Sequence, residues 1–359
     1  MCNAFVKLGN EVTYLVTDRK TSITEDPETF FGVPILFTVD KVSVPDVSGR
    51  SPHIPRILHP SLFFIQRLVY AYRASKYIRS QRFDLVYGRD EWILWLLSLW
   101  IKTQIVWESH EARFSFAARK LAVTIPIVVI AEGIRDFYVG HGVDPRRILV
   151  AYDAVDERFF EPLCTTIGAR EKLGISSTKP IALYIGGLER WKGAHILCEA
   201  GRGQDTFDVY VMGGKEKEIT EMQIIYPYVH FLGFHPYREL PVHQQVADVL
   251  VIPNTGTTLI STLYTSPLKL FTYMTAQKPI VASRIQSITN VLSSDEAYFC
   301  SADSPHDLQK TIIAALANPV ESSQKSERAY QKSLHSTWLL RARSIVTFLT
   351  SHRGGVRGT

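Results

Sequence analysis

A helix start within Thr265–Ser283 (TSPLKLFTYMTAQKPIVAS) has the residue types of an anion-binding site. Ser266 is a favourable N-cap, and Pro267 suits the first helical position, where a missing N–H has no cost. The residues from Pro279 onward have the pattern of a buried strand. A loop that enters a helix at the carboxyl edge of a parallel sheet binds phosphates, so we expect a phosphate-bearing ligand here.

A second loop of this kind occurs in Ile181–Leu197 (IALYIGGLERWKGAHIL). A buried strand runs into Gly186-Gly187, which let the backbone approach a ligand, and Arg190 and Lys192 can contact phosphate. The pattern is neither the dinucleotide fingerprint nor a Walker P-loop, and alone it fits a solvated basic turn equally well. Two strand ends of one doubly wound sheet meet at the same edge, which favours a shared phosphate site.

A third strand end, in Val229–Pro241 (VHFLGFHPYRELP), places Gly233 and Phe234 at the same edge. The glycine backbone and the aromatic ring are suited to holding a nucleotide base. A plain turn is the alternative interpretation.

In the first half, Gln104–Ser115 (QIVWESHEARFS) places Ser109, His110 and Glu111 at the end of a buried strand. A histidine at a strand end can act as a base or donate a hydrogen bond to a forming charge. Arg89 ends the preceding strand and can join the same site. The alternative is that His110 is structural.

Several classes of site are not expected. The sequence has no Asp-x-Asp pair that would hold a metal against a nucleotide sugar, and no GxSxG motif of an α/β-hydrolase. Its four cysteines are scattered without a Cys/His cluster, so we expect no disulfide framework and no zinc site, and a cytoplasmic location. No cofactor is expected either. We expect no signal peptide, because the first residues lack a basic start and a small-residue cleavage site. We expect no membrane-spanning helix, because the longest apolar runs fall short of about 20 residues. No nucleic-acid partner is expected.

Composition is that of an ordinary soluble protein: 359 residues, 46% hydrophobic, 21% charged, with a net charge of +5. The small positive excess permits anionic ligands or an anionic membrane surface. A tryptophan-rich run at 92–101 predicts a helix packed against a sheet, with a membrane-facing patch as the alternative. We expect a solvated face for the basic residues Arg67, Arg73, Lys76, Arg79 and Arg82. Peripheral contact with the inner face of the membrane is the alternative interpretation.

The positioning elements form a regular alternation of strands and helices, which predicts parallel sheets covered on both faces. Twelve strands exceed one such sheet, so we expect two doubly wound domains, at 1–160 and 161–335, and a helix with a flexible tail at 336–359. The pattern begins inside a first helix that ends at Lys7–Asn10, so a first strand and its glycine turn are expected to be missing from this sequence. The expected strands are Glu11–Val16, Ile35–Val39, Asp84–Tyr87, Gln104–Trp107, Ile125–Ile130, Ile148–Tyr152, Ile181–Ile185, Asp208–Met212, His230–Leu232, Asp248–Ile252, Pro279–Ala282 and Ala297–Cys300.

Together these segments resemble the retaining glycosyltransferases of the GT-B fold, family 4 type (glycosyl transferases group 1). The most specific stretches are YIGGLERWKG, VHFLGFHPYRELP and TSPLKLFTYMTAQKPIVAS, and DLVYGRD and VWESHE match in order. The resemblance implies two Rossmann-like domains facing a central cleft, with the C-terminal helix crossing back to the first domain.

The resemblance also implies residue roles. Lys192, with Arg190 as a possible substitute for an arginine that the family has at Gly187, would bind the donor diphosphate. Backbone N–H groups of Ser266, Leu268 and Lys269 would face the same phosphates, and Gly233 and Phe234 would border the base. His110 would lie near the transferred sugar, with Arg89 and Glu111 on the acceptor side.

The sequence departs from the family at its paired glutamates. Tyr264 and Thr272 stand in their places, and Thr272 can give the donor ribose only a neutral hydrogen bond. Gln277 stands where the family has a glycine in a left-handed backbone.

The expected activity is metal-independent transfer of a sugar, with retention, from a nucleotide sugar to a glycan or lipid-linked acceptor, as a hexosyltransferase-type enzyme of polysaccharide biosynthesis. The alternative is a weakened or inactive homologue that binds a partner.

Overall fold

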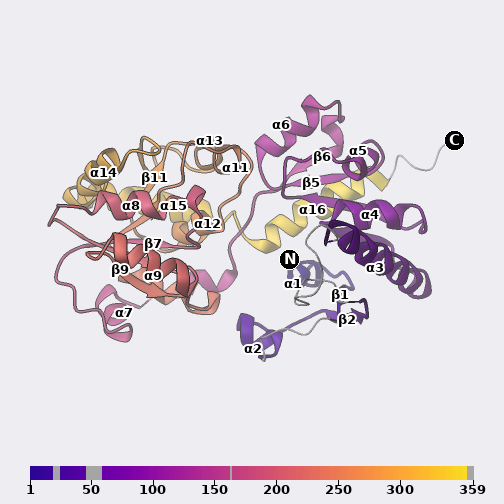
Figure 1. The fold of residues 1–359 in the computed structure, drawn as a ribbon, viewed down its shortest axis with the longest axis horizontal. Coiled ribbons are helices and arrows are strands. Elements are labelled where there is room, and N and C mark those ends of the chain that lie inside the picture. The colour runs from indigo at the N-terminus through magenta and orange to yellow at the C-terminus, as the bar shows by residue number, and fades with distance from the viewer. Residues whose placement is uncertain (19–24, 46–58, 162–163, 354–359) are drawn as a thin grey trace. The chain divides into compact units, whose positions relative to one another are not determined.

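The computed structural model describes residues 1–18, 25–45, 59–161 and 164–353. By its internal packing the chain forms two compact units (Figure 1). The N-terminal unit comprises Met1–Ala151 together with Ala342–Thr359, and the C-terminal unit comprises Tyr152–Arg341. The domain limits expected at 160 and 335 stay predictions.

The C-terminal unit is built on one six-stranded parallel sheet in the order β12-β11-β10-β7-β8-β9. Its strands are β7 (Ile181–Ile185), β8 (Asp208–Met212), β9 (His230–Gly233), β10 (Val249–Ile252), β11 (Ile280–Ser283) and β12 (Tyr298–Cys300). Its helices are α7 (Thr166–Lys172), α8 (Ala194–Ala200), α9 (Glu216–Ile225), α10 (Leu240–His243), α11 (Leu259–Thr262), α12 (Leu268–Thr275), α13 (Gln286–Thr289), α14 (Pro305–Ala317) and α15 (Pro319–Ser333). Short 3₁₀ turns are η3 (Glu157–Phe160), η4 (Arg190–Lys192), η5 (Tyr237–Glu239) and η6 (Gln244–Val246).

The sequence of β7 shows why this sheet is covered on both faces. Ile181, Leu183 and Ile185 belong to one buried cluster, whereas Ala182 and Tyr184 belong to another. Successive side chains of a strand point to opposite faces, so a run that is apolar at every position must be buried on both sides. The continuous apolar pattern therefore sets the central position of β7.

In the described part of the N-terminal unit there are two separate parallel sheets, β1-β2 and β3-β4-β5-β6. Their strands are β1 (Thr13–Thr17), β2 (Thr38–Val42), β3 (Leu85–Gly88), β4 (Gln104–Ser109), β5 (Ile127–Val129) and β6 (Ile148–Val150). Its helices are α1 (Cys2–Lys7), α2 (Pro27–Phe31), α3 (His59–Gln81), α4 (Glu91–Ser98), α5 (Phe116–Ala122) and α6 (Glu132–Gly140), with the 3₁₀ turn η2 (Pro145–Arg147).

The strand order of these sheets can be compared with that of a usual doubly wound domain. A doubly wound sheet usually has the strand order 3-2-1-4-5-6, with the first strand in the middle. Among the described residues, β1 and β2 pair with each other and are separate from the series β3-β4-β5-β6. The first helix is α1, which ends before Gly9 at φ +83°, and the expected absence of a first strand stays a prediction.

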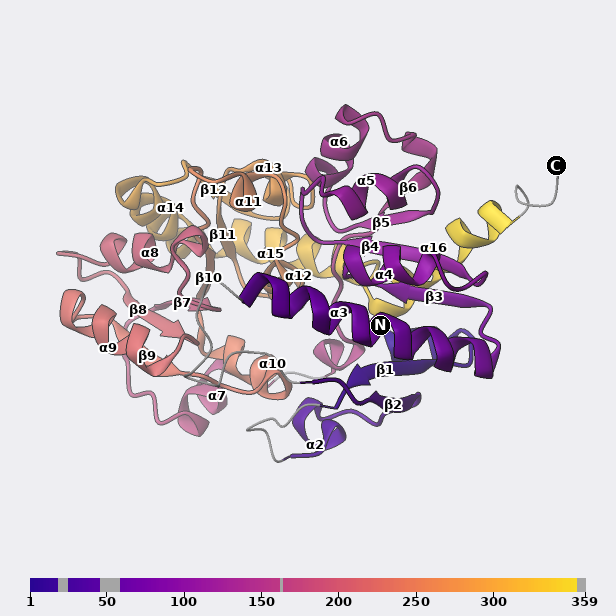
Figure 2. The ribbon, with the colours of Figure 1, turned by 45° about the vertical axis from the view of Figure 1, so that its right-hand side comes forward.

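The last helix, α16 (Trp338–Arg353), begins in the C-terminal unit and ends in the N-terminal unit. Ile345 and Leu349 pack into a core cluster with Val106, Val128 and Ala151 of the N-terminal unit. Figure 2 shows α16 beside the sheet that contains β3 and β4. The crossing helix of the expected fold is confirmed.

All twelve expected strands are present, with ends that shift by at most a few residues. The expected N-cap is wrong: α12 begins at Leu268 with Pro267 in the capping position, and Ser266 Oγ instead accepts the backbone N–H of Asp153 at 2.8 Å. The tail expected to be flexible starts within α16, and residues 354–359 lie outside the described part.

Candidate functional site

The loop after β7 is held in place by two buried tyrosines. Tyr184 donates its hydroxyl to the carbonyl of Gly187 at 2.6 Å. The backbone N–H of Ile185 donates to the hydroxyl of Tyr273, on α12, at 2.7 Å. The two hydrogen bonds therefore connect the glycine loop to the helix that carries Lys269.

Close packing explains why glycines occupy this loop and the next turn. A Cβ on Gly193, whose φ is +76°, would lie 1.8 Å from the carbonyl oxygen of Pro253. A Cβ on Gly187 would lie 2.3 Å from a carboxylate oxygen of Glu189 and 3.0 Å from Nζ of Lys192. The first position excludes any side chain, and the second keeps the backbone beside two charged groups.

Two lysines flank the glycine loop. Lys192 forms an ion pair with Glu189, with 2.9 Å between Nζ and Oε2. Nζ of Lys269 is buried, lies 4.0 Å from the centre of the Tyr184 ring, and has no hydrogen-bond partner among the described residues. Burial first, and then the nearby Lys192, hold the pKa of Lys269 well below its ordinary value.

A buried ammonium that has an aromatic ring beside it but no hydrogen-bond partner is unfavourable, because transferring a charge from water into protein costs several kcal/mol. An anion bound at the glycine loop would remove that cost and would meet the positive charges of Lys269 and Lys192. The geometry is therefore that of an incomplete anion site.

Arg190 lies in a different place from the two lysines at the glycine loop. It lines a pocket of about 430 Å³ together with His195, Glu199 and Asp303, and Lys192 is not part of that lining. Burial first, and then Arg190, lower the pKa of His195. The structure therefore brings Lys192 and Lys269 together at the glycine loop and places Arg190 in a neighbouring pocket.

Other expected donor-side residues lie on α12 and β9. Leu268 is exposed at the first position of α12, and Gln277 has the left-handed backbone expected after it, with φ +53°. Thr272 is only 4% exposed, and its hydroxyl donates to the carbonyl of Lys269 at 3.1 Å. Its side chain thus points into the protein.

Gly233 lies at the end of β9 with φ +76°. Its carbonyl accepts the N–H of Gly213 at 2.6 Å, and a Cβ on it would have open space. Phe234 beside it is 71% exposed, so its ring is free to stack on a planar group. The role of both residues in base binding stays a prediction.

In the N-terminal unit a buried carboxylate organises the expected histidine. Glu108, on β4, is 1% exposed, and its Oε1 accepts from Nε2 of His110 at 2.6 Å and lies 3.2 Å from a guanidinium nitrogen of Arg89. The hydroxyl of Tyr87 donates to the other carboxylate oxygen of Glu108, Oε2. A neutral His110 that donates from Nε2 presents Nδ1 as an acceptor, which suits a base or a hydrogen-bond acceptor.

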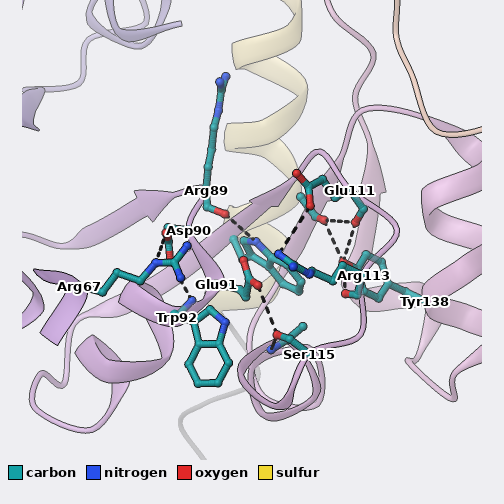
Figure 3. Close-up of polar contacts among 12 residues, drawn as sticks. Arg67, Arg89, Asp90, Glu91, Trp92, Glu111, Arg113, Ser115 and Tyr138 are labelled. Carbon is teal, nitrogen blue, oxygen red and sulfur yellow. Dashed lines mark hydrogen bonds and ion pairs between the residues drawn. The ribbon is translucent and has the colours of Figure 1, made fainter. Parts of the chain in front are cut away.

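Glu111 does not join this cluster. Its side chain is exposed and lies 4.0 Å from Arg113, while its backbone carbonyl accepts hydrogen bonds from Ser109 and from Tyr138 (Figure 3). Tyr138 is buried and donates to the carbonyl of Arg113 as well. These bonds fix the loop that carries His110.

A separate cluster positions Arg89 by way of its neighbour. Asp90 caps α4 by accepting the N–H groups of Trp92 and Ile93 at 3.0 Å, and it pairs with Arg67 at 2.9 Å. Figure 3 shows the Arg89 side chain pointing away from this capping group. Arg67, expected on a solvated face, is thus part of the structure of the strand end.

Residues 179–318 match the family model of the glycosyl transferases group 1. For this segment the resemblance to the glycosyl transferases group 1 is confirmed. A curated relative with a similar sequence is the D-inositol 3-phosphate glycosyltransferase of Geodermatophilus obscurus, 27% identical over 142 residues. The match covers 34% of this chain, and the chain spans about a third of that relative, 31% of its length.

Solved structures with the same fold cover nearly the whole chain. Sucrose-phosphate synthase from Thermosynechococcus elongatus has a TM-score of 0.75 at 15% identity, covering 98% of this chain and 92% of that one. Anabaena HepE in complex with UDP has a TM-score of 0.69 at 16% identity, covering 88% and 86%. They show the GT-B fold of two Rossmann-like domains.

Sequence reasoning missed Glu108, the residue that orients His110. A charged residue inside the strand VWES, two positions before the histidine, was the available signal, because a buried carboxylate needs partners. The sequence also did not predict that Nζ of Lys269 would lack a hydrogen-bond partner among the described residues.

Proposed function

We propose that this chain is a glycosyltransferase whose C-terminal unit binds a nucleoside diphosphate sugar. The observation that carries the proposal is the unpartnered Nζ of Lys269, buried beside Lys192 at the glycine loop. The match of residues 179–318 to the glycosyltransferase family supports it. HepE, which shares the fold, has been crystallised with UDP and with UDP-glucose.

The two lysines suggest how the leaving group is stabilised. As the bond to the sugar breaks, negative charge accumulates on the diphosphate, and fixed ammonium groups at a dry site stabilise it strongly. Lys269 and Lys192 would supply this charge without a metal at the diphosphate, with retention of the anomeric configuration as in the family that the chain resembles.

On the acceptor side we propose that His110 contacts the transferred sugar or the acceptor, oriented by Glu108. The acceptor would be a glycan or a lipid-linked glycan. Among the described residues no helix has the length and hydropathy needed to cross a membrane. α3, the long helix in the foreground of Figure 2, exposes Phe63, Phe64 and Ile65, which supports a peripheral contact with lipid.

A weakened homologue that binds nucleotide without efficient transfer is the second candidate. The observation that favours it is the position of Thr272, which is buried and donates its hydroxyl to a carbonyl of its own helix. This hydroxyl is therefore poorly placed to form a hydrogen bond with a ribose. Replacing Thr272→Glu tests this candidate. A gain in UDP affinity or transfer supports the weakened site, whereas no gain means that the ribose is bound by other groups.

Calorimetric titration with UDP tests the proposal. We expect saturable binding at nucleotide concentrations below about 1 mM. Lys192→Ala should weaken it, whereas Lys278→Ala, in the same unit but bonded to Thr166, should not. Absence of binding at millimolar UDP and millimolar GDP would contradict the assignment of a donor site.

A further inference from the structure

Three side chains after β9 converge on one point. His235 precedes η5, Glu239 ends η5 and His243 ends α10, each four residues after the one before. One potential ligand atom from each lies within 4.8 Å of the others. This set lies outside the glycine loop and the two lysines of the proposed donor site.

The separations suit a metal better than hydrogen bonds. Nδ1 of His235 lies 3.6 Å and Nε2 of His243 lies 3.7 Å from Oε2 of Glu239. Both distances exceed a hydrogen bond. Ligand atoms at about 2.0–2.1 Å from a tetrahedral zinc ion are roughly 3.3–3.5 Å apart, close to what is found here.

His235 is already oriented as a metal ligand. Its Nε2 lies 3.2 Å from the carbonyl oxygen of Leu232, so this nitrogen carries the proton that it donates. The other nitrogen, Nδ1, then presents a lone pair toward Glu239. Metal-binding histidines generally donate their second nitrogen to a carbonyl or carboxylate in this way.

His243 is buried at 5% exposure, and its Nδ1 has no hydrogen-bond partner among the described residues. Its other nitrogen faces Glu239 beyond hydrogen-bond reach. A buried imidazole in this condition calls for an explanation such as an ion.

We propose that His235, Glu239 and His243 bind a zinc ion, with water as the fourth ligand. Two imidazoles and a carboxylate suit zinc, whereas magnesium and calcium prefer oxygen ligands alone. The ion would join η5 to α10 and fix the residues that follow Gly233 and Phe234. This inference is independent of the sugar-transfer proposal, because it concerns binding of the metal alone.

Zinc titration of the full chain, without an affinity tag of histidines and after removal of metal by a chelator, tests the site. We expect one equivalent to bind with micromolar or tighter affinity and to raise Tm as its concentration rises. Cobalt in place of zinc should give the visible absorption of a tetrahedral ion. No nucleotide is added, so failure here and failure of UDP binding are separate results.

Variants decide where the metal binds. His243→Asn and Glu239→Gln should each weaken zinc binding at least 100-fold, and Glu239 is 41% exposed, so its variant should fold even if the buried one does not. His306→Asn, at an exposed position on α14, is the matched control and should bind zinc as the wild type does. Equal binding by wild type and Glu239→Gln, or absence of saturable binding, overturns the proposal.

Discussion

Each unit has a charged group that is buried near the end of a strand or the start of a helix, and the surroundings of these two groups differ. In the N-terminal unit, Glu108 is surrounded by His110, Arg89 and Tyr87. In the C-terminal unit, Nζ of Lys269 is buried without a hydrogen-bond partner among the described residues. The carboxylate is satisfied by the protein itself, whereas the ammonium is not.

The difference separates two kinds of functional group. A charge whose partners are all built in serves to position its neighbours, here His110. A buried charge without a partner destabilises the free protein, and pairing with a ligand of opposite charge removes this penalty, which strengthens binding. The same contrast predicts opposite responses when each charge is removed.

Removing the lysine charge should have the largest effect. In Lys269→Met we expect UDP affinity to fall by about 2–5 kcal/mol, because a buried charge pair with the diphosphate is lost. The free energy of unfolding without ligand should stay the same or increase, since an unpaired buried charge is gone. Calorimetry and urea unfolding measure the two quantities.

The matched control for that variant is Lys278→Met. Burial also lowers the pKa of Lys278, but its Nζ donates a hydrogen bond to the hydroxyl of Thr166 at 2.7 Å. The control variant should lose some stability and keep its UDP affinity. If Lys269→Met were destabilised while its UDP affinity were unchanged, the unpaired charge would be structural and the comparison would fail.

Removing the carboxylate should act in the opposite way. In Glu108→Gln we expect the free energy of unfolding to fall by about 1.5–3 kcal/mol, the size of hydrogen bonds to a charged group. UDP affinity should be unchanged, because the residue belongs to the other unit, whereas sugar transfer should fall with His110 no longer held. An unaltered urea midpoint for this variant would argue against the paired arrangement.

The smallest effect is a difference in pH dependence. The folded pKa of Lys269 is well below its value in the unfolded chain, near 10.4. Between those two values the unfolded chain binds more protons, so this group makes stability rise with pH, by at most about 1.4 kcal/mol per pH unit. Urea unfolding across that pH range should show the extra slope in wild type and not in Lys269→Met.

Ligand binding supplies the converse of that prediction. UDP favours the charged ammonium, so the complex should take up a proton at pH values above the folded pKa, and UDP affinity should weaken as pH rises through it. Heats of UDP binding in buffers of different ionisation enthalpy measure this uptake. Equal proton uptake by wild type and Lys269→Met would assign it to another group.

The architecture was largely predictable from sequence because apolar periodicity sets it. The run Ile181–Ile185 is apolar at every position, is only five residues long and is followed by two glycines, which together indicate a central parallel strand. Gln277 was expected to need a left-handed backbone and has one. Such features depend on residues near one another in the chain.

The site was less predictable because its geometry depends on distant residues. Ser266 has the residue type of an N-cap, but a contact with Asp153, more than a hundred positions away, uses its hydroxyl instead. The sequence analysis did not single out His235, Glu239 and His243, because the convergence of their ligand atoms follows from how η5 and α10 fold. Side-chain partners follow from packing rather than from local pattern.

The split sheet of the N-terminal unit implies an uneven distribution of opening energies along the chain. β1 and β2 pair only with each other among the described strands, and an isolated two-stranded ladder has little stability of its own. β7 has strand neighbours on both sides and clusters on both faces. Amide protons of β1 and β2 should therefore exchange with solvent through local opening, whereas those of β7 should exchange only when the whole unit unfolds.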